Sequence, residues 1–343
     1  MTGDGEPGAA SNVEEPIAPG TASSRGAPGT ASLPGVPVAA VDCGTNSTRL
    51  LVAGPDGAVL DRRMQVTRLG QGVDATHRLD PRAIDRTVAV LRDYRQVMDR
   101  FGVGRVRLVA TSAARDAVNA ELFFEQVEAV TGVRPELLSG SDEGRLSFAG
   151  ATARLPAAFD VASPVLVVDI GGGSTELAVG TPAGESPAAI SVDVGCVRVT
   201  ERVLTDDPPT SAQLDEARRA VRVEVERARR ALPRPGPGGW LVGLAGTVST
   251  LSMLVHRTAV YERRLVHHSV VSLAEVEEWL GRLAGEPAGA RARRPGMVEG
   301  REDVIVGGVV VLAEVMAVFE RSRCLVSEDD ILDGLAASLM AGG

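Results

Sequence analysis

The sequence contains no lysine, so all 36 of its basic residues are arginines. A Walker A phosphate loop and a Schiff-base enzyme each need a lysine, and both classes are therefore excluded. The HExxH, GxSxG and GxGxxG patterns are also missing, which argues against zinc proteases, serine hydrolases of the nucleophile-elbow type and dinucleotide-binding enzymes. Any chemistry must come from carboxylates, hydroxyls, arginines and backbone groups.

Cysteine and histidine are scarce, with three and four residues in a chain of 343. The cysteines Cys43, Cys196 and Cys324 are far apart and odd in number, which predicts neither a disulfide framework nor a zinc site. We expect them to be free and to behave as small apolar residues. The histidines at 77, 256, 267 and 268 form no recognisable metal set.

Long apolar runs and a signal peptide are lacking as well, so we expect a cytoplasmic protein without a membrane span. The net charge of −9 argues against a nucleic-acid partner. Residues 1–35 consist almost entirely of small residues, proline and glutamate, and we predict a disordered N-terminal tail there. The remainder is long enough for two domains.

An internal repeat is the clearest feature that is present. Val38 to Val52 aligns without gaps on Val165 to Val179. Each copy has an apolar run ending in aspartate, a turn of glycine and small polar residues, and a second apolar run, which predicts a β-hairpin. The repeat therefore indicates a duplicated domain in which each half opens with a hairpin.

The segments around the repeat predict a mixed α/β protein. Helices are expected at 81–101, from 119, at 214–232, 247–255 and 329–340, and strands at 105–110, 240–244 and 324–326. Alternating strands and helices imply, in each half, a largely parallel or mixed sheet covered by helices. Ligands of such folds bind at the carboxyl ends of the strands, in the cleft between the halves.

Three glycine-rich turns are candidate phosphate-binding sites. Glycine permits close approach, and successive backbone N–H groups form a concavity that favours anions. A helix that starts after such a turn adds its dipole. Any one of these turns could be purely steric, whereas three in one chain favour phosphate. The residues concerned are Gly44, Thr45, Asn46, Ser47, Gly171, Gly172, Gly173, Ser174, Thr175, Gly246 and Thr247.

Carboxylates near these turns could supply a cation site and a base. Asp42 and Asp169 lie at the ends of the two repeated strands, with Glu176 on the returning strand, and such hard oxygen ligands suit Mg²⁺. Glu176 could equally be a solvated strand residue. Glu143 lies at the start of a predicted helix, and its residue type alone favours a role in stabilising the helix dipole. Arg115 could hold phosphate bidentately or lie on the surface.

Taken together, these segments resemble the exopolyphosphatase/guanosine-pentaphosphate phosphatase (Ppx/GppA) family of the sugar kinase/heat-shock-70/actin superfamily. The resemblance rests on VAAVDCGTNSTRLLVA, ATSAARDAVN, LLSGSDEGRLSFAGA, VVDIGGGSTEL, DVGCVRVTE, GLAGTVSTL and SEDDILDGLAASL. It implies an α/β fold of duplicated actin-like (ribonuclease H-like) domains with a cleft between them. Domain I would comprise 36–140 and 327–343, and domain II 141–326, with the C-terminal helix packing on domain I.

The resemblance also implies roles for the candidate residues. Glu143 would be the catalytic base that activates water. Asp169 and Glu176 would belong to a magnesium site that Asp42 assists through water. The first two glycine turns, Arg115, and Gly246 with Thr247 would hold the end of the substrate.

The implied activity is Mg²⁺-dependent hydrolysis of the terminal phosphate of polyphosphate, by a homodimer. Alternatives are hydrolysis of guanosine pentaphosphate, an ATP-dependent kinase, or a non-catalytic nucleotide sensor. Longer family members carry a further C-terminal helical half, so this chain resembles the short two-domain form. Arginines that could bind long polymer are Arg218, Arg219, Arg222, Arg227, Arg229, Arg230, Arg291, Arg293 and Arg294. For those between 218 and 230, interleaved glutamates favour a solvated helix face.

Overall fold

The computed structural model describes residues 35–156, 163–184, 186–236 and 241–341. Residues 1–34, which carry nearly all of the predicted tail, lie outside this part, as does Trp240 of the predicted strand 240–244. Residues 35–343 form one compact unit that contains two β-sheets. The domain boundaries placed at 140 and 326 stay a prediction.

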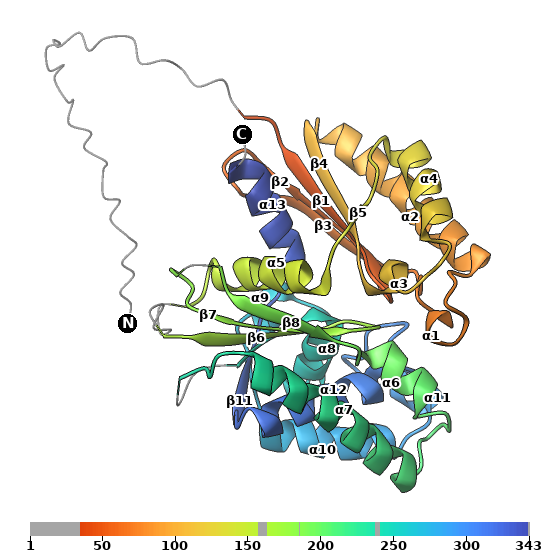
Figure 1. Cartoon of the computed structure of the whole chain (residues 1–343), viewed down its shortest axis with the longest axis vertical. Helices are drawn as coiled ribbons and strands as arrows, with labels where there is room; N and C mark the ends of the chain where they lie inside the picture. Colours follow the sequence, from red (N-terminus) through yellow and green to blue (C-terminus); the bar gives the residue numbers. More distant parts are fainter. Residues whose placement is uncertain (1–34, 157–162, 185, 237–240, 342–343) are drawn as a thin grey trace, which may run out of the picture. The chain divides into compact units, whose positions relative to one another are not determined.

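The first sheet has the strand order β3-β2-β1-β4-β5. β1, β2 and β3 are antiparallel, and β4 and β5 continue parallel to β1. The strands are β1 (Val38–Cys43), β2 (Ser47–Ala53), β3 (Val59–Val66), β4 (Arg105–Ala110) and β5 (Glu136–Leu137) (Figure 1).

The second sheet repeats this order as β8-β7-β6-β9-β11 and adds β10 at its edge. The β6–β7 hairpin of this sheet pairs Asp169 with Glu176, and the β1–β2 hairpin of the first sheet pairs Asp42 with Arg49 in the same way. Both predicted hairpins are therefore confirmed, and so is the duplicated α/β fold. The strands are β6 (Val165–Ile170), β7 (Thr175–Gly180), β8 (Ala188–Val192), β9 (Leu241–Leu244), β10 (Val270–Ser272) and β11 (Arg323–Val326).

Helices cover both faces of the first sheet. One face packs against α2 (Pro81–Arg100) and α4 (Ala120–Thr131), where Leu91 and Phe123 are fully buried. α2 begins where the sequence predicts, because the Asp80 side chain accepts hydrogen bonds from the first turn. The other face packs against the C-terminal helix α13 (Ile331–Ala341), as the family resemblance implies. The short helices α1 (Val73–Thr76) and α3 (Ser112–Arg115) lie in the connecting segments.

The second sheet packs on a larger helical layer. Its centre is α12 (Ile305–Val318), in which every residue except Ala317 is buried. Glu314 in this helix is fully buried and forms ion pairs with Arg218 and Arg222, two of the candidate polymer-binding arginines. The other helices are α6 (Cys196–Arg202), α7 (Ser211–Ala231), α8 (Ala245–Val255), α9 (Arg263–Val266), α10 (Leu273–Ala284) and α11 (Ala288–Arg291).

Helix α5 (Gly140–Thr152) contacts both α13, on the first sheet, and strands β7 and β8 of the second. Its contact with α13 is close because of two glycines. A Cβ on Gly150 would lie 1.8 Å from the Asp330 carbonyl oxygen, and one on Gly334 would lie 2.2 Å from that of Leu146. This packing fixes the helix that carries Glu143.

All three cysteines are free and buried, as the sequence predicts. In the described ranges, no helix combines the length and the apolar character that crossing a bilayer requires.

Candidate active site

The first glycine turn, Gly44 to Ser47, joins β1 to β2. The Gly44 N–H donates to the Ser47 carbonyl (3.0 Å) and closes the turn. The carbonyls of Thr45 and Asn46 accept from backbone N–H groups of residues 67, 68 and 70. Carbonyl oxygens, which would repel an anion, are thus occupied by protein donors on this side of the site.

The second turn, Gly171 to Ser174, shows the same arrangement. The Gly171 and Gly172 carbonyls accept from the first N–H groups of α6 at 2.9 to 3.1 Å, and the Gly173 carbonyl accepts from the Arg198 side chain. The two turns also touch, because a Cβ on Gly172 would lie 2.8 Å from Thr45 Cβ. Only glycine allows this approach.

Four carboxylates gather around these turns. Asp42 and Asp169 each lie one position before the end of their strand, at the base of the turns. Asp42 Oδ2 accepts from Arg49 (2.7 Å), and Asp169 Oδ2 accepts from the Ser147 hydroxyl (2.7 Å). Arg49 also pairs with Asp330, at 2.5 Å.

The two glutamates approach the turns from α5 and β7. Glu143 Oε2 pairs with Arg115 Nη1 at 2.7 Å. Glu176 Oε1 accepts from the Ser191 hydroxyl (2.7 Å) and lies 4.0 Å from Arg115 Nη2. Arg115, at the end of α3, thus faces both glutamates from the half of the protein opposite to β7.

The carboxyl pKa values of this group are raised. Burial raises the pKa of Glu143 to about 7 and that of Asp169 to about 6, in each case against the lowering effect of a nearby arginine. Burial and repulsion from Glu143 raise the pKa of Glu176, and burial raises that of Asp42. Burial is the main cause in each case, and at neutral pH Glu143 is therefore about half protonated.

These carboxylates are compatible with a bound cation, which would favour their ionised forms. Asp42 Oδ1 is buried and has no hydrogen-bond partner among the described residues. Over the same residues, no three His, Cys, Asp or Glu side chains form a ready metal site. One or two carboxylates, completed by water and phosphate oxygens, is the ligand set that Mg²⁺ commonly uses.

A cavity of about 70 Å³ connects most of the predicted residues. Those that line it are Asp42, Gly44, Thr45, Asn46, Ser47, Glu143, Asp169, Gly171, Gly172, Ser174 and Gly246. Gly246 lies in the first turn of α8, which starts two residues before the predicted helix. The cavity thus joins turns that are distant in the sequence.

Other predicted residues lie beside the cavity or away from it. Arg115 and Glu176 stand behind Glu143 and Ser174, and Gly173 faces a neighbouring small pocket. The structure turns Thr175 away, because its hydroxyl donates to the Val194 carbonyl at 2.6 Å.

Thr247 is likewise buried, at 2% exposure, and packs against Gly308 in α12. Its neighbour Gly246 therefore supplies the cavity wall at this helix terminus.

Two arginines complete the lining and were not among the predicted site residues. In the internal repeat, Arg49 aligns with Glu176, and this alignment does not indicate a role for Arg49 in the site. Arg301 is 7% exposed, its guanidinium covers Gly246, and no ion pair of its side chain occurs among the described residues. Burial lowers its pKa. No sequence pattern distinguishes Arg301 from the other arginines.

A second pocket, of about 480 Å³, adjoins this cavity and shares Arg49, Gly246 and Arg301 with it. Its wall includes the apolar or aromatic side chains of Met64, Met253, Tyr261, Val298 and Leu332. Five arginines line the same pocket, so the cavity is continuous with a roomier space that is both apolar and basic.

Comparisons with known proteins agree with this architecture. The chain matches the model of the Ppx/GppA phosphatase family over residues 52–341. It is 44% identical over 318 residues to exopolyphosphatase 2 of Mycobacterium tuberculosis, covering 88% of this chain and 98% of that protein. A solved exopolyphosphatase-like protein is 36% identical, with a TM-score of 0.85 over 90% of this chain and 99% of the other. The Aquifex aeolicus Ppx/GppA structure is 30% identical, with a TM-score of 0.74 and the same coverages.

Proposed function

The chain belongs to the Ppx/GppA phosphatase family, and from this premise we propose that it is an exopolyphosphatase, which hydrolyses the terminal phosphate of inorganic polyphosphate. The observation that carries the proposal is Glu143, a carboxylate whose side chain is 12% exposed on the wall of a cavity between two glycine turns. Its pKa of about 7 is near the value at which a general base works best at neutral pH.

The glycine turns would hold the terminal phosphate. Their carbonyls are occupied by protein donors, and the hydroxyls of Thr45, Ser47 and Ser174 complete an anion-binding surface. Arg301 supports this role, because a buried arginine without an acidic partner is costly unless an anion compensates it. The first turn of α8 adds further positive potential, whereas the charge of Arg49 is balanced by Asp42 and Asp330.

Glu143 would take the proton of a water molecule that attacks the terminal phosphorus in line with the departing phosphate chain. Phosphoryl transfer depends mainly on positioning and electrostatic stabilisation, so a rigidly held base can support it without a covalent intermediate on the protein. Arg115 would keep Glu143 oriented and partly ionised.

Asp42 and Asp169, with Glu176 behind them, fit a magnesium ion. Bound there, the ion would supply charge neutralisation for the phosphate oxygens. The unpartnered oxygen of Asp42 and the raised pKa of Asp169 support this assignment.

The test is phosphate release by the purified protein with and without Mg²⁺, using long polyphosphate and tripolyphosphate. Glu143→Gln should lower kcat by about 100- to 10,000-fold, the range for a lost general base. Asp142→Asn is the matched control, since Asp142 is the exposed neighbour that pairs with Arg145. Equal activity of Glu143→Gln and the wild type would refute the assignment of the base.

A second candidate substrate is guanosine pentaphosphate, a nucleotide whose terminal phosphate would bind in the same cavity. The observation that favours it is the adjoining pocket of about 480 Å³, which combines apolar and aromatic side chains that could contact a nucleoside with five arginines that suit phosphate groups. Running this nucleotide in parallel decides between the two. Phosphate transfer from ATP to a second substrate, without hydrolysis, would indicate a kinase.

The cytoplasmic location and the homodimer remain predictions. Size-exclusion chromatography with light scattering measures the last of these directly.

A further inference from the structure

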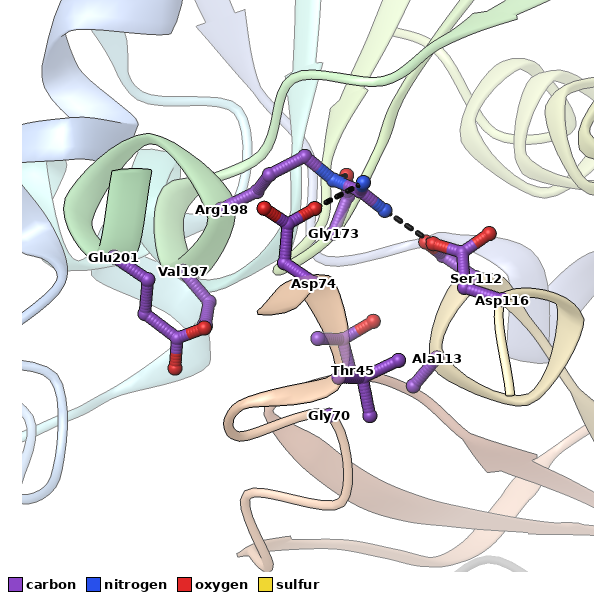
Figure 2. Close-up of a pocket in the computed structure, with 11 residues that line it drawn as sticks. Thr45, Gly70, Asp74, Ser112, Ala113, Asp116, Gly173, Val197, Arg198 and Glu201 are labelled. Carbon is purple, nitrogen blue, oxygen red and sulfur yellow. Dashed lines mark hydrogen bonds and ion pairs between the residues drawn. The ribbon is translucent and has the colours of Figure 1, made fainter. Parts of the chain in front are cut away.

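Arg198, on α6, is buried and makes three side-chain contacts through separate nitrogens. Its Nε donates to the Gly173 carbonyl at 2.6 Å, and its Nη1 donates to Asp74 Oδ1 at 2.6 Å. Its Nη2 pairs with Asp116. Figure 2 shows the guanidinium between the two carboxylates, with Gly173 beside it.

The three acceptors belong to different parts of the protein. Gly173 lies in the second glycine turn, attached to the second sheet. Asp74 lies in α1, which follows the first sheet's strand β3, and Asp116 follows Arg115 directly at the end of α3. One planar side chain thus connects the second turn to two segments of the opposite half.

We propose that Arg198 is a positioning residue, which holds the second glycine turn against the first half of the protein so that both turns engage the same phosphate. The inference rests on the proposed function, since it concerns how that site is assembled. Arg198 does not line the catalytic cavity, so it acts through the residues it holds.

The local geometry makes this role specific to arginine. The guanidinium presents its donors in a fixed planar fork, whereas the lysine ammonium is a single point charge. The turn that it holds is tightly fitted, because a Cβ on Gly173 would lie 2.5 Å from the Ser112 hydroxyl oxygen of α3. Small displacements of the turn therefore change the spacing between the two phosphate-binding loops.

Charge gives Arg198 a second effect on an anionic substrate. Asp74 and Asp116 have side chains that are 16% and 31% exposed, so both are only partly hydrated. Removing the guanidinium would leave Asp74 paired with Arg202 alone and would take from Asp116 its ion pair with Arg198, next to Arg115 in the chain. Substrate binding should weaken for both reasons.

The experiment compares Arg198→Met and Arg198→Lys with Arg202→Gln. Arg202 is the matched control, since its side chain is 51% exposed and pairs with Asp74 without touching the glycine turn. With tripolyphosphate as substrate, both Arg198 variants should raise KM about tenfold or more and change kcat less. Arg202→Gln should stay within about twofold of the wild type, as is usual for exposed pairs.

Adding Asp116→Asn to Arg198→Met separates positioning from general destabilisation. The KM of the double variant should lie between those of Arg198→Met and the wild type, because Asp116→Asn removes the uncompensated charge, although the double variant retains fewer contacts. An Arg198→Met protein that has a lower melting temperature but unchanged KM and kcat would refute the proposal.

Two further measurements test the role of Arg198 if Arg198→Met does not fold or if the wild type is inactive. If Arg198→Met does not fold, Asp74→Asn and Asp116→Asn keep the Gly173 contact and should each raise KM by a smaller factor; an unchanged KM in both overturns the inference. If the wild type releases no phosphate, the proposed function fails. Calorimetric binding of tripolyphosphate to the same variants then decides the role of Arg198.

Discussion

Replacing Arg115 by methionine should move the pH dependence of catalysis upward. Arg115 Nη1 lies 2.7 Å from Glu143 Oε2, and the same nitrogen also donates to the Leu138 carbonyl at 3.0 Å. Burial raises the pKa of Glu143 to about 7, while the positive charge of Arg115 opposes this rise. Methionine keeps much of the side-chain volume and removes that opposing charge.

The size of the effect follows from the contact. An adjacent arginine lowers a carboxyl pKa by about 1 to 3 pH units, so its loss should shift the acid limb of the profile upward by about one unit or more. At pH 7 the ionised fraction of Glu143 would fall from about half to about a tenth or less. We therefore expect kcat/KM at pH 7 to fall about fivefold from this cause alone, with partial recovery near pH 9.

The assay is the pH profile of kcat/KM for phosphate release, which reports ionisations of the free enzyme. Arg115→Lys keeps a positive charge and should shift the profile less. Arg145→Met is a control, because Arg145 pairs with the exposed Asp142. A uniform loss at every pH, with the acid limb unmoved, would refute the argument and limit Arg115 to binding the substrate.

Three further predictions concern stability. The raised pKa values of Glu143 and Asp169 mean that the folded protein binds protons at these carboxyls more tightly than the unfolded chain does. The free energy of unfolding should therefore fall by roughly a few kcal/mol as the pH rises from about 4 to about 7. Urea unfolding at pH 5 and pH 8 measures this, and Mg²⁺ should stabilise more at pH 8; equal stability at both pH values would contradict it. Gly334→Ala should destabilise by about 1 to 3 kcal/mol, because its Cβ would lie 2.2 Å from the Leu146 carbonyl oxygen. Gly281→Ala, in helix α10 with open space around it, should instead stabilise by about 0.5 to 1 kcal/mol, and the reverse order would show that α5 and α13 readjust.

The elements that the sequence predicts correctly are those whose signal is local. The helix starting at Pro81 follows from its Asp80 cap, and the hairpins follow from an apolar run, an aspartate and a glycine turn. Because the hairpin sequence is repeated, the same local pattern predicts both halves of the protein. The two sheets accordingly share a strand order. Strand β10 at the edge of the second sheet was not predicted, because three residues with one partner strand leave little periodic signal.

The candidate site was predicted only where glycine or carboxylate patterns mark it. Thr175 has the residue type of a phosphate ligand, and the choice of the Val194 carbonyl as its partner depends on β8 and the loop after it. Arg301 reaches the cavity by lying over Gly246, which is distant in the sequence. Such contacts have no local signature.

The amino-acid sequence alone determined the duplicated α/β plan, the two glycine turns and the exclusion of lysine chemistry, because these depend on residue type and short-range periodicity. The tertiary structure alone decided what each arginine does. Arg218 neutralises Glu314 in the core, Arg115 faces Glu143, Arg198 connects the two halves and Arg301 lies in the cavity without an acidic partner among the described residues. The physical reason is that the effect of a charge depends on its burial and its partners, and both are set by residues that only folding brings together.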